Sequence, residues 1–182
     1  MEKIDRRILK SQQAIQSAFL TMLIHEGFDD ITVKNISEKA NIGRKTFYLH
    51  YIDKYDLLDK IVDNHLKCLR EICDAKKDKG FIEGTIIWFS YFQQHKLFFA
   101  ALFRSESTLS FRKKLLTFIM GEIDKKLDSN TALNEQIDRY MILKFLGTAV
   151  MGVLESYTLD EIDDDIEAIA RQVGILVKRN LS

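Results

Sequence analysis

The chain contains no proline in 182 residues, and this absence limits what it can fold into. Average proline usage is ~5%, so a chain of this length would normally carry about nine. Proline breaks helix interiors and marks loops, and glycine, the other residue that interrupts helices, occurs only 8 times. The composition therefore predicts an all-α protein with short connections between its helices.

Hydrophobic residues make up 46% of the sequence, which is enough to build a core and excludes a disordered chain. Uninterrupted apolar stretches, such as residues 97–103, are much shorter than the ~18 residues of a membrane span. The first residues do not resemble a secretory leader, and two cysteines are too few for a disulfide scaffold. We therefore expect a cytoplasmic protein with no membrane partner.

Apolar residues recur at three-, four- and seven-residue steps along most of the chain, the spacing of amphipathic helices. About nine helices are predicted, over residues 5–26, 33–40, 44–51, 54–76, 81–94, 95–103, 110–128, 135–158 and 163–179. We expect two domains: a small three-helix N-terminal domain, residues 1–53, and a larger helical domain, residues 54–182.

Four residues are suited to helix ends and turns. Thr32 and Asp53 precede predicted helices, and their side-chain oxygens can cap free amide groups. Gly27 follows the first helix, at a position that favours glycine. Asn41 lies in the turn between the two short helices, and asparagine tolerates positive φ better than most residues.

The two short helices, joined by a few residues and preceded by a longer helix, predict a helix-turn-helix. Phe47 and Tyr51 share one face of the second short helix and are expected to pack beneath the first. The other face carries no acid and consists of Arg44, Lys45, Thr46, Tyr48, Leu49 and His50. Such a face suits a helix that enters the ~12 Å wide major groove of DNA.

The net charge of the whole chain is zero, but charge is distributed unevenly along it. Residues 32–54 contain five basic and two acidic side chains, a net charge of +3. Residues 155–170 contain seven acidic side chains and no basic one. The positive segment coincides with the predicted helix-turn-helix. The acidic segment suits a solvated helix start, where the helix dipole favours negative charge.

The segment from Gly27 to Leu58 resembles the TetR family of bacterial transcription regulators. The matching elements, at the family's spacing, are Phe28, Thr32, Ile36, Ala40, Ile42, Thr46-Phe47-Tyr48, His50-Tyr51, Lys54 and Leu57-Leu58. The resemblance implies a homodimer that binds a double-stranded DNA operator through its N-terminal domain. It also implies that the C-terminal domain binds a small-molecule effector.

The resemblance assigns roles to eight residues of the N-terminal domain. The implied base-reading residues are Arg44, Lys45 and Leu49. Those implied to touch phosphates or nearby bases are Thr46, Tyr48 and His50. The implied clamps on the DNA backbone are Thr32 and Lys54. The family often has glycine where Lys45 stands, so this chain is expected to prefer bases of its own.

The last two predicted helices carry long apolar stripes, which the resemblance implies form a four-helix dimer interface. The candidate interface residues are Ile142, Phe145, Leu146, Ala149, Val150, Val153, Ile169, Val173 and Leu176. Gly147 and Gly152 would permit close helix approach. The alternative is that these stripes form the core of a single chain, because globular bundles use similar patterns.

The central predicted helices are rich in aromatic residues, where the resemblance implies an effector pocket. Candidate pocket residues are Asn64, His65, Trp88, Tyr91, Phe92, Arg104 and Phe118. Ligand sites combine apolar walls with a few polar groups. The alternative is that these aromatics form ordinary core.

Other classes of site find little support in the sequence. His65 and Cys68 lie three residues apart, but a closed metal site needs about four ligands and no convincing others appear. We therefore predict no metal and no cofactor. Enzymatic motifs such as a phosphate-binding glycine loop or HExxH are also absent. The predicted function is a DNA-binding repressor released by a ligand. The alternative is a helical adaptor whose C-terminal domain binds a protein partner.

Overall fold

The structure, a computed structural model, describes residues 6–75, 79–127 and 137–181. Within these ranges it is all-helical, which confirms the predicted fold class. The helices are α1 Arg6–His25, α2 Val33–Lys39, α3 Arg44–Tyr48, α4 Lys54–Ala75, α5 Phe81–Gln94, α6 Lys96–Arg104, α7 Leu109–Asp124, α8 Arg139–Thr158 and α9 Ile166–Arg179, with a short 3-10 helix, η1, at Glu106–Thr108. Among these described helices, none has both the length and the apolar character to cross a membrane.

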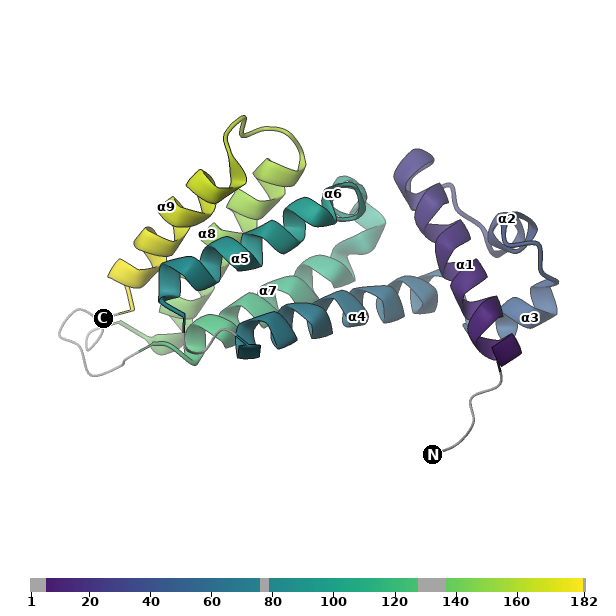
Figure 1. Ribbon diagram of the computed structural model, residues 1–182, viewed down its shortest axis with the longest axis horizontal. Coiled ribbons are helices and arrows are strands. Elements are labelled where there is room, and N and C mark those ends of the chain that lie inside the picture. Colours follow the sequence, from purple (N-terminus) through teal and green to yellow (C-terminus); the bar gives the residue numbers. More distant parts are fainter. Residues whose placement is uncertain (1–5, 76–78, 128–136, 182) are drawn as a thin grey trace.

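The helices form a small head and a larger bundle joined by α4 (Figure 1). The head contains α1, α2 and α3 at one end of the molecule. Helix α4 begins beside the head and runs the length of the bundle, where α5 packs along α9 and α7 along α8. Helix α6 also contacts α1, so the bundle meets the head through a second helix besides α4.

The head is held together by apolar side chains at helical spacing on α1. Ile15, Phe19 and Leu23 are fully buried, and Phe28 packs edge-to-face against Phe19 with ring centroids 6.3 Å apart. Phe47 from α3 is also fully buried, as predicted. Burial of such side chains supplies most of the stability of a small helical unit, because short helices alone are marginal.

The predicted caps and turns are confirmed. Thr32 Oγ1 accepts the Asn35 amide N–H at 3.2 Å, and Asp53 Oδ1 accepts the amides of residues 55 and 56 at 2.9 and 2.8 Å. Gly27 has φ +85° and Asn41 has φ +52°, so both turns use the left-handed conformation expected of these residues.

Several helix ends differ from the prediction. Helix α3 ends at Tyr48 rather than at residue 51, because the Leu49 amide bonds the carbonyls of both Lys45 and Thr46 and the chain turns toward α4. Helices α8 and α9 begin later than predicted, after the N-caps Asp138 and Asp165. These two starts follow the side-chain hydrogen bonds that Asp138 and Asp165 accept from amides in the first turns of α8 and α9. Of the predicted helix ends, residues 5, 76, 128 and 135 lie outside the described part of the chain.

The two glycines expected at a dimer interface have different surroundings. A Cβ on Gly147 would lie 2.8 Å from Met120 Cγ, so this glycine permits close approach of α8 to α7 in the same chain. A Cβ on Gly152 would meet nothing within 4 Å. A third glycine, Gly174, permits α9 to approach α5, since its Cβ would lie 3.3 Å from Ile82 Cα.

The structure corrects the expectation that the whole apolar stripe of α8 and α9 faces a partner chain. Five of the nine candidates are buried within one chain: Ile142, Leu146, Val150, Ile169 and Val173. Val153 is half-buried. Phe145 and Leu176 are 69% and 59% exposed, and Ala149 is exposed as well. The reason is helical geometry: residues 142, 146 and 150 share one side of α8, and residues 145 and 149 share another.

Candidate nucleic-acid interface

Helix α3 presents one side to solvent and anchors the other in the head. Phe47 is fully buried and Tyr51, just after the helix, is 3% exposed, so these two rings fix the orientation of α3. Arg44 and Lys45 are exposed, as are Tyr48 at 58% and Leu49 at 80%. The predicted DNA-facing side of α3 is therefore available to a partner. Thr46, between these residues, is half-buried.

Three of the predicted DNA-binding side chains are engaged within the protein. The Thr32 hydroxyl donates to Asn35 Oδ1 at 2.7 Å while it caps α2. His50 Nε2 and Ser11 Oγ share a hydrogen bond of 2.7 Å, which links the turn that follows α3 to α1. Lys54 Nζ donates to the carbonyls of Phe28 and Asp29 at 3.0 and 3.1 Å.

Lys54, the first residue of α4, holds the connection between α1 and α2 in place through these hydrogen bonds. Its ammonium also lies 4.6 Å from the centre of the Phe28 ring, a cation–π contact. The ammonium thus satisfies two carbonyls in the connection between α1 and α2 and holds α4 against the head. Sequence reasoning identified Lys54 but not these contacts, because its partners lie about 25 residues away in the sequence.

The same connection meets the bundle on its other side. Ser105 Oγ donates to Asp29 Oδ2 at 3.0 Å, and Ser107 also bonds this carboxylate. These hydroxyls hold the pKa of the Asp29 carboxyl below its usual value, with a smaller contribution from the nearby Lys54 charge. Ser105 and Ser107 lie in the connection between α6 and α7, so this contact joins the head to the bundle.

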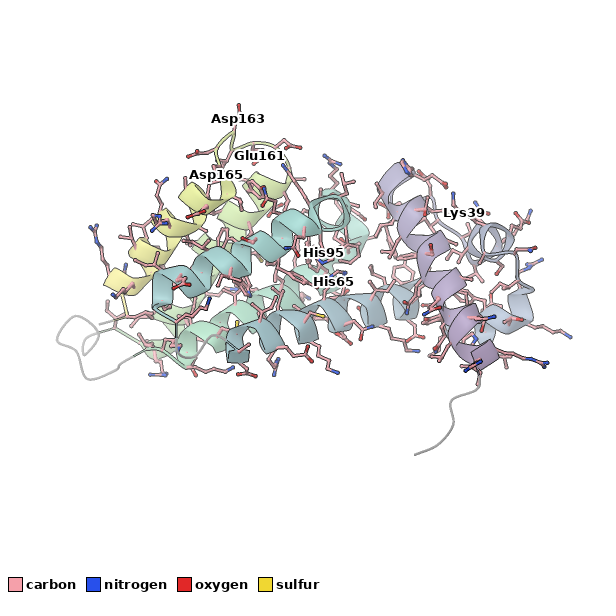
Figure 2. All side chains as sticks on the ribbon, viewed as in Figure 1. Lys39, His65, His95, Glu161, Asp163 and Asp165 are labelled. Atoms are coloured by element: carbon pink, nitrogen blue, oxygen red, sulfur yellow. The ribbon has the colours of Figure 1, made fainter. Side chains whose placement is uncertain are left out.

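Two of the predicted pocket residues form a packed cluster instead of lining an open space. His65 Nδ1 and the Tyr91 hydroxyl share a hydrogen bond of 2.7 Å, and His65 stacks on Phe98 with centroids 4.4 Å apart. Figure 2 shows His65 beside His95 between α4 and the helices that cover it. Burial lowers the pKa of His65 to about 4, lowers that of His95 and raises that of Tyr91.

A cavity of about 490 Å³ lies elsewhere in the bundle, and Trp88 is the one predicted pocket residue that lines it. Phe92 is fully buried and Phe118 lines a separate groove between α4 and α7. Asn64 and Arg104 are exposed. Val150 and Val173, expected at a dimer interface, line the cavity instead. Across the described ranges, no cluster of side chains has the composition of a metal site.

Comparison with known proteins matches both parts of the chain to family profiles. Residues 15–61 match the profile described as "Bacterial regulatory proteins, tetR family", and residues 81–179 match a "Transcriptional regulator C-terminal region". The chain belongs to the TetR family. It is a DNA-binding transcriptional regulator, with its helix-turn-helix in the head.

Two curated relatives are helix-turn-helix transcription regulators, and one solved structure shares the fold. The transcriptional regulator YxbF of Bacillus subtilis is 40% identical over 62 residues, which span 34% of this chain and 16% of YxbF. DhaS of Lactococcus lactis, the dhaKLM operon transcriptional activator, is 20% identical over 153 residues, covering 81% of this chain and 79% of DhaS. A TetR-family regulator from Syntrophomonas wolfei has the same fold, with a TM-score of 0.74 at 19% identity over 93% of this chain and 94% of its own.

Proposed function

We propose that this TetR-family protein binds a two-fold DNA operator as a homodimer and that a small molecule in the bundle lowers its affinity for that operator. The observation that supports the proposal is the exposed side of α3. This side carries two cations beside an exposed tyrosine and an exposed leucine. Binding to an operator would place the protein in the cytoplasm.

We assign base reading to Arg44, Lys45 and Leu49. Arginine and lysine hydrogen-bond guanine most often, and apolar side chains contact the thymine methyl group. Tyr48 and Thr46 have hydroxyls suited to phosphate oxygens. Thr32, His50 and Lys54 position the motif through their bonds within the head, and in this proposal they act on DNA through α2 and α3.

The exposed part of α8, together with Leu176 on α9, is the proposed dimer surface. Tyr140, Met141 and Phe145 are 63%, 58% and 69% exposed, and Ala149 and Gly152 continue the same face with small side chains. A run of large exposed apolar residues marks an interaction surface. Pairing of two chains would present two α3 helices, and two-fold dimers place such helices ~34–36 Å apart on DNA.

We propose that the Asp29 contact transmits the effector signal. Asp29 is bonded by Ser105 and Ser107 of the bundle, and its carbonyl is bonded by Lys54 at the start of α4. A shift of α6 or α4 on ligand binding would move this connection and with it α2 and α3. The coupling free energy between the two sites is then set by the ratio of the operator affinities with and without bound ligand.

The test is selection of duplexes from a random pool, followed by affinity measurements at several salt concentrations. We expect a two-fold sequence and a fall of log affinity with log salt, with a slope of about 0.9 for each phosphate contacted. Failure to bind any duplex at low salt would contradict the proposal. Expression of a reporter behind the operator then decides the sign of regulation: we expect repression, and activation would refute that part.

The dimer surface has its own test. Phe145→Asp places a charge in the proposed interface, so sedimentation should show monomers in place of dimers. Operator binding by this variant should be weakened. Leu97→Asp is the matched control, because Leu97 is 65% exposed on α6, outside this surface. Dimers that persist in Phe145→Asp, or that are lost equally in the control, would contradict the assignment.

A further inference from the structure

The first two turns of α1 carry three cations that lie outside the DNA-facing side of α3. Arg6, Arg7 and Lys10 are all exposed, and α1, the 20-residue helix that they begin, contains no acidic side chain. We call these three residues the α1 cationic patch. Residues 1–5 have a net charge of −1, so the first ten residues together still carry +2. The TetR profile matches from residue 15 onward, so the patch lies outside the segment that the family pattern describes.

Contacts within the protein do not account for these charges. Across the ranges that the structure describes, neither Arg6 nor Lys10 forms an ion pair with a carboxylate. The two side chains lie four residues apart on α1, where like charges repel each other. The helix dipole also disfavours positive charge in the first turn of a helix. The patch is therefore kept at a cost to α1, which suits a role toward an anion outside the protein.

A hydrogen-bonded link holds the patch beside α3. Ser11 Oγ donates to the carbonyl of Ile8 at 2.9 Å, and since a hydroxyl has one hydrogen, Oγ then accepts from His50 Nε2 at 2.7 Å. Farther along α1, Gln16 Nε2 donates to the Tyr51 hydroxyl at 3.1 Å. Figure 1 shows the start of α1 beside α3, at the end of the molecule away from the bundle. The patch therefore lies next to the turn that follows α3.

The patch continues the DNA-facing side of α3 past the last residues of that helix. Tyr48 and Leu49, which precede His50, are 58% and 80% exposed. Arg7 lies four residues before Ser11 and so shares the side of α1 that meets His50. A helix in the major groove, which is ~12 Å wide, has the phosphates of one strand on each side. Cations beside the end of α3 would therefore meet the phosphates of one of these strands.

We propose that the α1 cationic patch binds DNA phosphates that flank the base pairs read by α3. Phosphate contacts carry no sequence information directly. The patch therefore adds affinity and fixes the orientation of the head on the duplex, while α3 still selects the bases. This inference rests on the proposed function, because it adds a contact to the same operator complex.

A double substitution tests the contact in the full chain. Arg6→Gln with Lys10→Gln removes two charges at exposed sites, so the fold should be retained. The variant should bind the selected operator about tenfold more weakly or worse at low salt. The slope of log affinity against log salt should fall by about two to four, because each phosphate contributes ~0.9 and a dimer carries the patch twice. The bases preferred in a random pool should stay those of wild type.

Two further variants separate a contact from a general effect of charge. Lys67→Gln with Lys126→Gln removes the same charge from exposed sites in the bundle and should leave the slope unchanged. Arg6→Lys with Lys10→Arg keeps both charges and should retain the wild-type slope. A wild-type slope in the glutamine variant of the patch, or an equal fall in the bundle variant, would overturn the inference. Circular dichroism checks that all variants keep their helices.

Ethylation of single phosphates locates the contact on the operator. Phosphates bound by the patch should interfere with binding of wild type when they are ethylated, and this interference should disappear in the glutamine variant while the rest persists. The same interference pattern in both proteins would overturn the inference and leave the proposed function intact. If wild type binds no duplex at any salt concentration, the proposed function fails and this inference fails with it.

Discussion

The DNA-facing side of α3 and the cavity at the far end of α4 are built in opposite ways. The first consists of near neighbours in the sequence, Arg44, Lys45, Tyr48 and Leu49, which project to solvent from a short helix that Phe47 anchors. The second is assembled from residues as far apart as Ile72 and Val177. A protruding surface is therefore specified locally, whereas a concave site depends on how several helices pack.

The largest expected effect comes from removal of the two cations of α3. Arg44→Ala with Lys45→Ala should lower operator affinity by on the order of 100-fold or more, because each base-specific contact contributes about 1–3 kcal/mol and a dimer has two heads. Fold stability should not change, since both side chains are exposed. Lys67→Ala, on an exposed part of α4, is the control. Fluorescence anisotropy with labelled operator measures all three proteins.

A pair of glycine variants tests the claim that the bundle depends on long-range packing. Gly174→Ala should lower the free energy of unfolding by about 1–3 kcal/mol, because its Cβ would press on the backbone of α5 at Ile82. Gly121→Ala has open space and should raise it by up to about 1 kcal/mol, since alanine favours helix. Urea denaturation compares them. Equal effects would show that helix propensity, and not packing between α5 and α9, controls stability here.

Lys54 distinguishes a residue that contacts DNA from one that supports the head. Lys54→Met should destabilise the protein by about 1–2 kcal/mol, because two carbonyls lose a charged donor. It should weaken binding to all sequences alike while the slope of log affinity against log salt stays unchanged. A phosphate contact would instead reduce that slope by about 1 for each head. The salt titration therefore decides between the two roles.

The smallest effect concerns pH and the buried cluster of the bundle. The pKa of His65 is lowered to about 4 by burial, against 6.5 for an ordinary histidine. Between these values the unfolded chain binds a proton that the folded chain does not, so stability should fall as pH decreases from about 6.5 toward 4. At pH 5 we expect a loss of roughly 1 kcal/mol, because partial exposure screens the effect.

Denaturation at pH 7.5 and pH 5 measures this loss. His65→Gln should reduce the difference between the two pH values, whereas His25→Gln should leave it unchanged, because His25 is exposed at the end of α1. The same pH dependence in wild type and His65→Gln would show that another group carries the proton.

The sequence by itself determined the all-helical class, the head and the orientation of α3. Absence of proline, apolar periodicity and the caps at Thr32 and Asp53 are local signals, and helices are built from local hydrogen bonds. The buried pair Phe47 and Tyr51 followed from their i, i+4 spacing. The exposed side of α3 could therefore be predicted from the order of the residues alone.

Only the tertiary structure decided which apolar residues of α8 face inward, what Lys54 bonds and where the cavity lies. Ile142 and Phe145 have the same chemical character, and their different burial depends on which side of α8 is turned toward the rest of the bundle. Lys54 reaches carbonyls about 25 residues away, and the cavity needs five helices at once. Such contacts arise from packing between distant segments, which local periodicity does not encode.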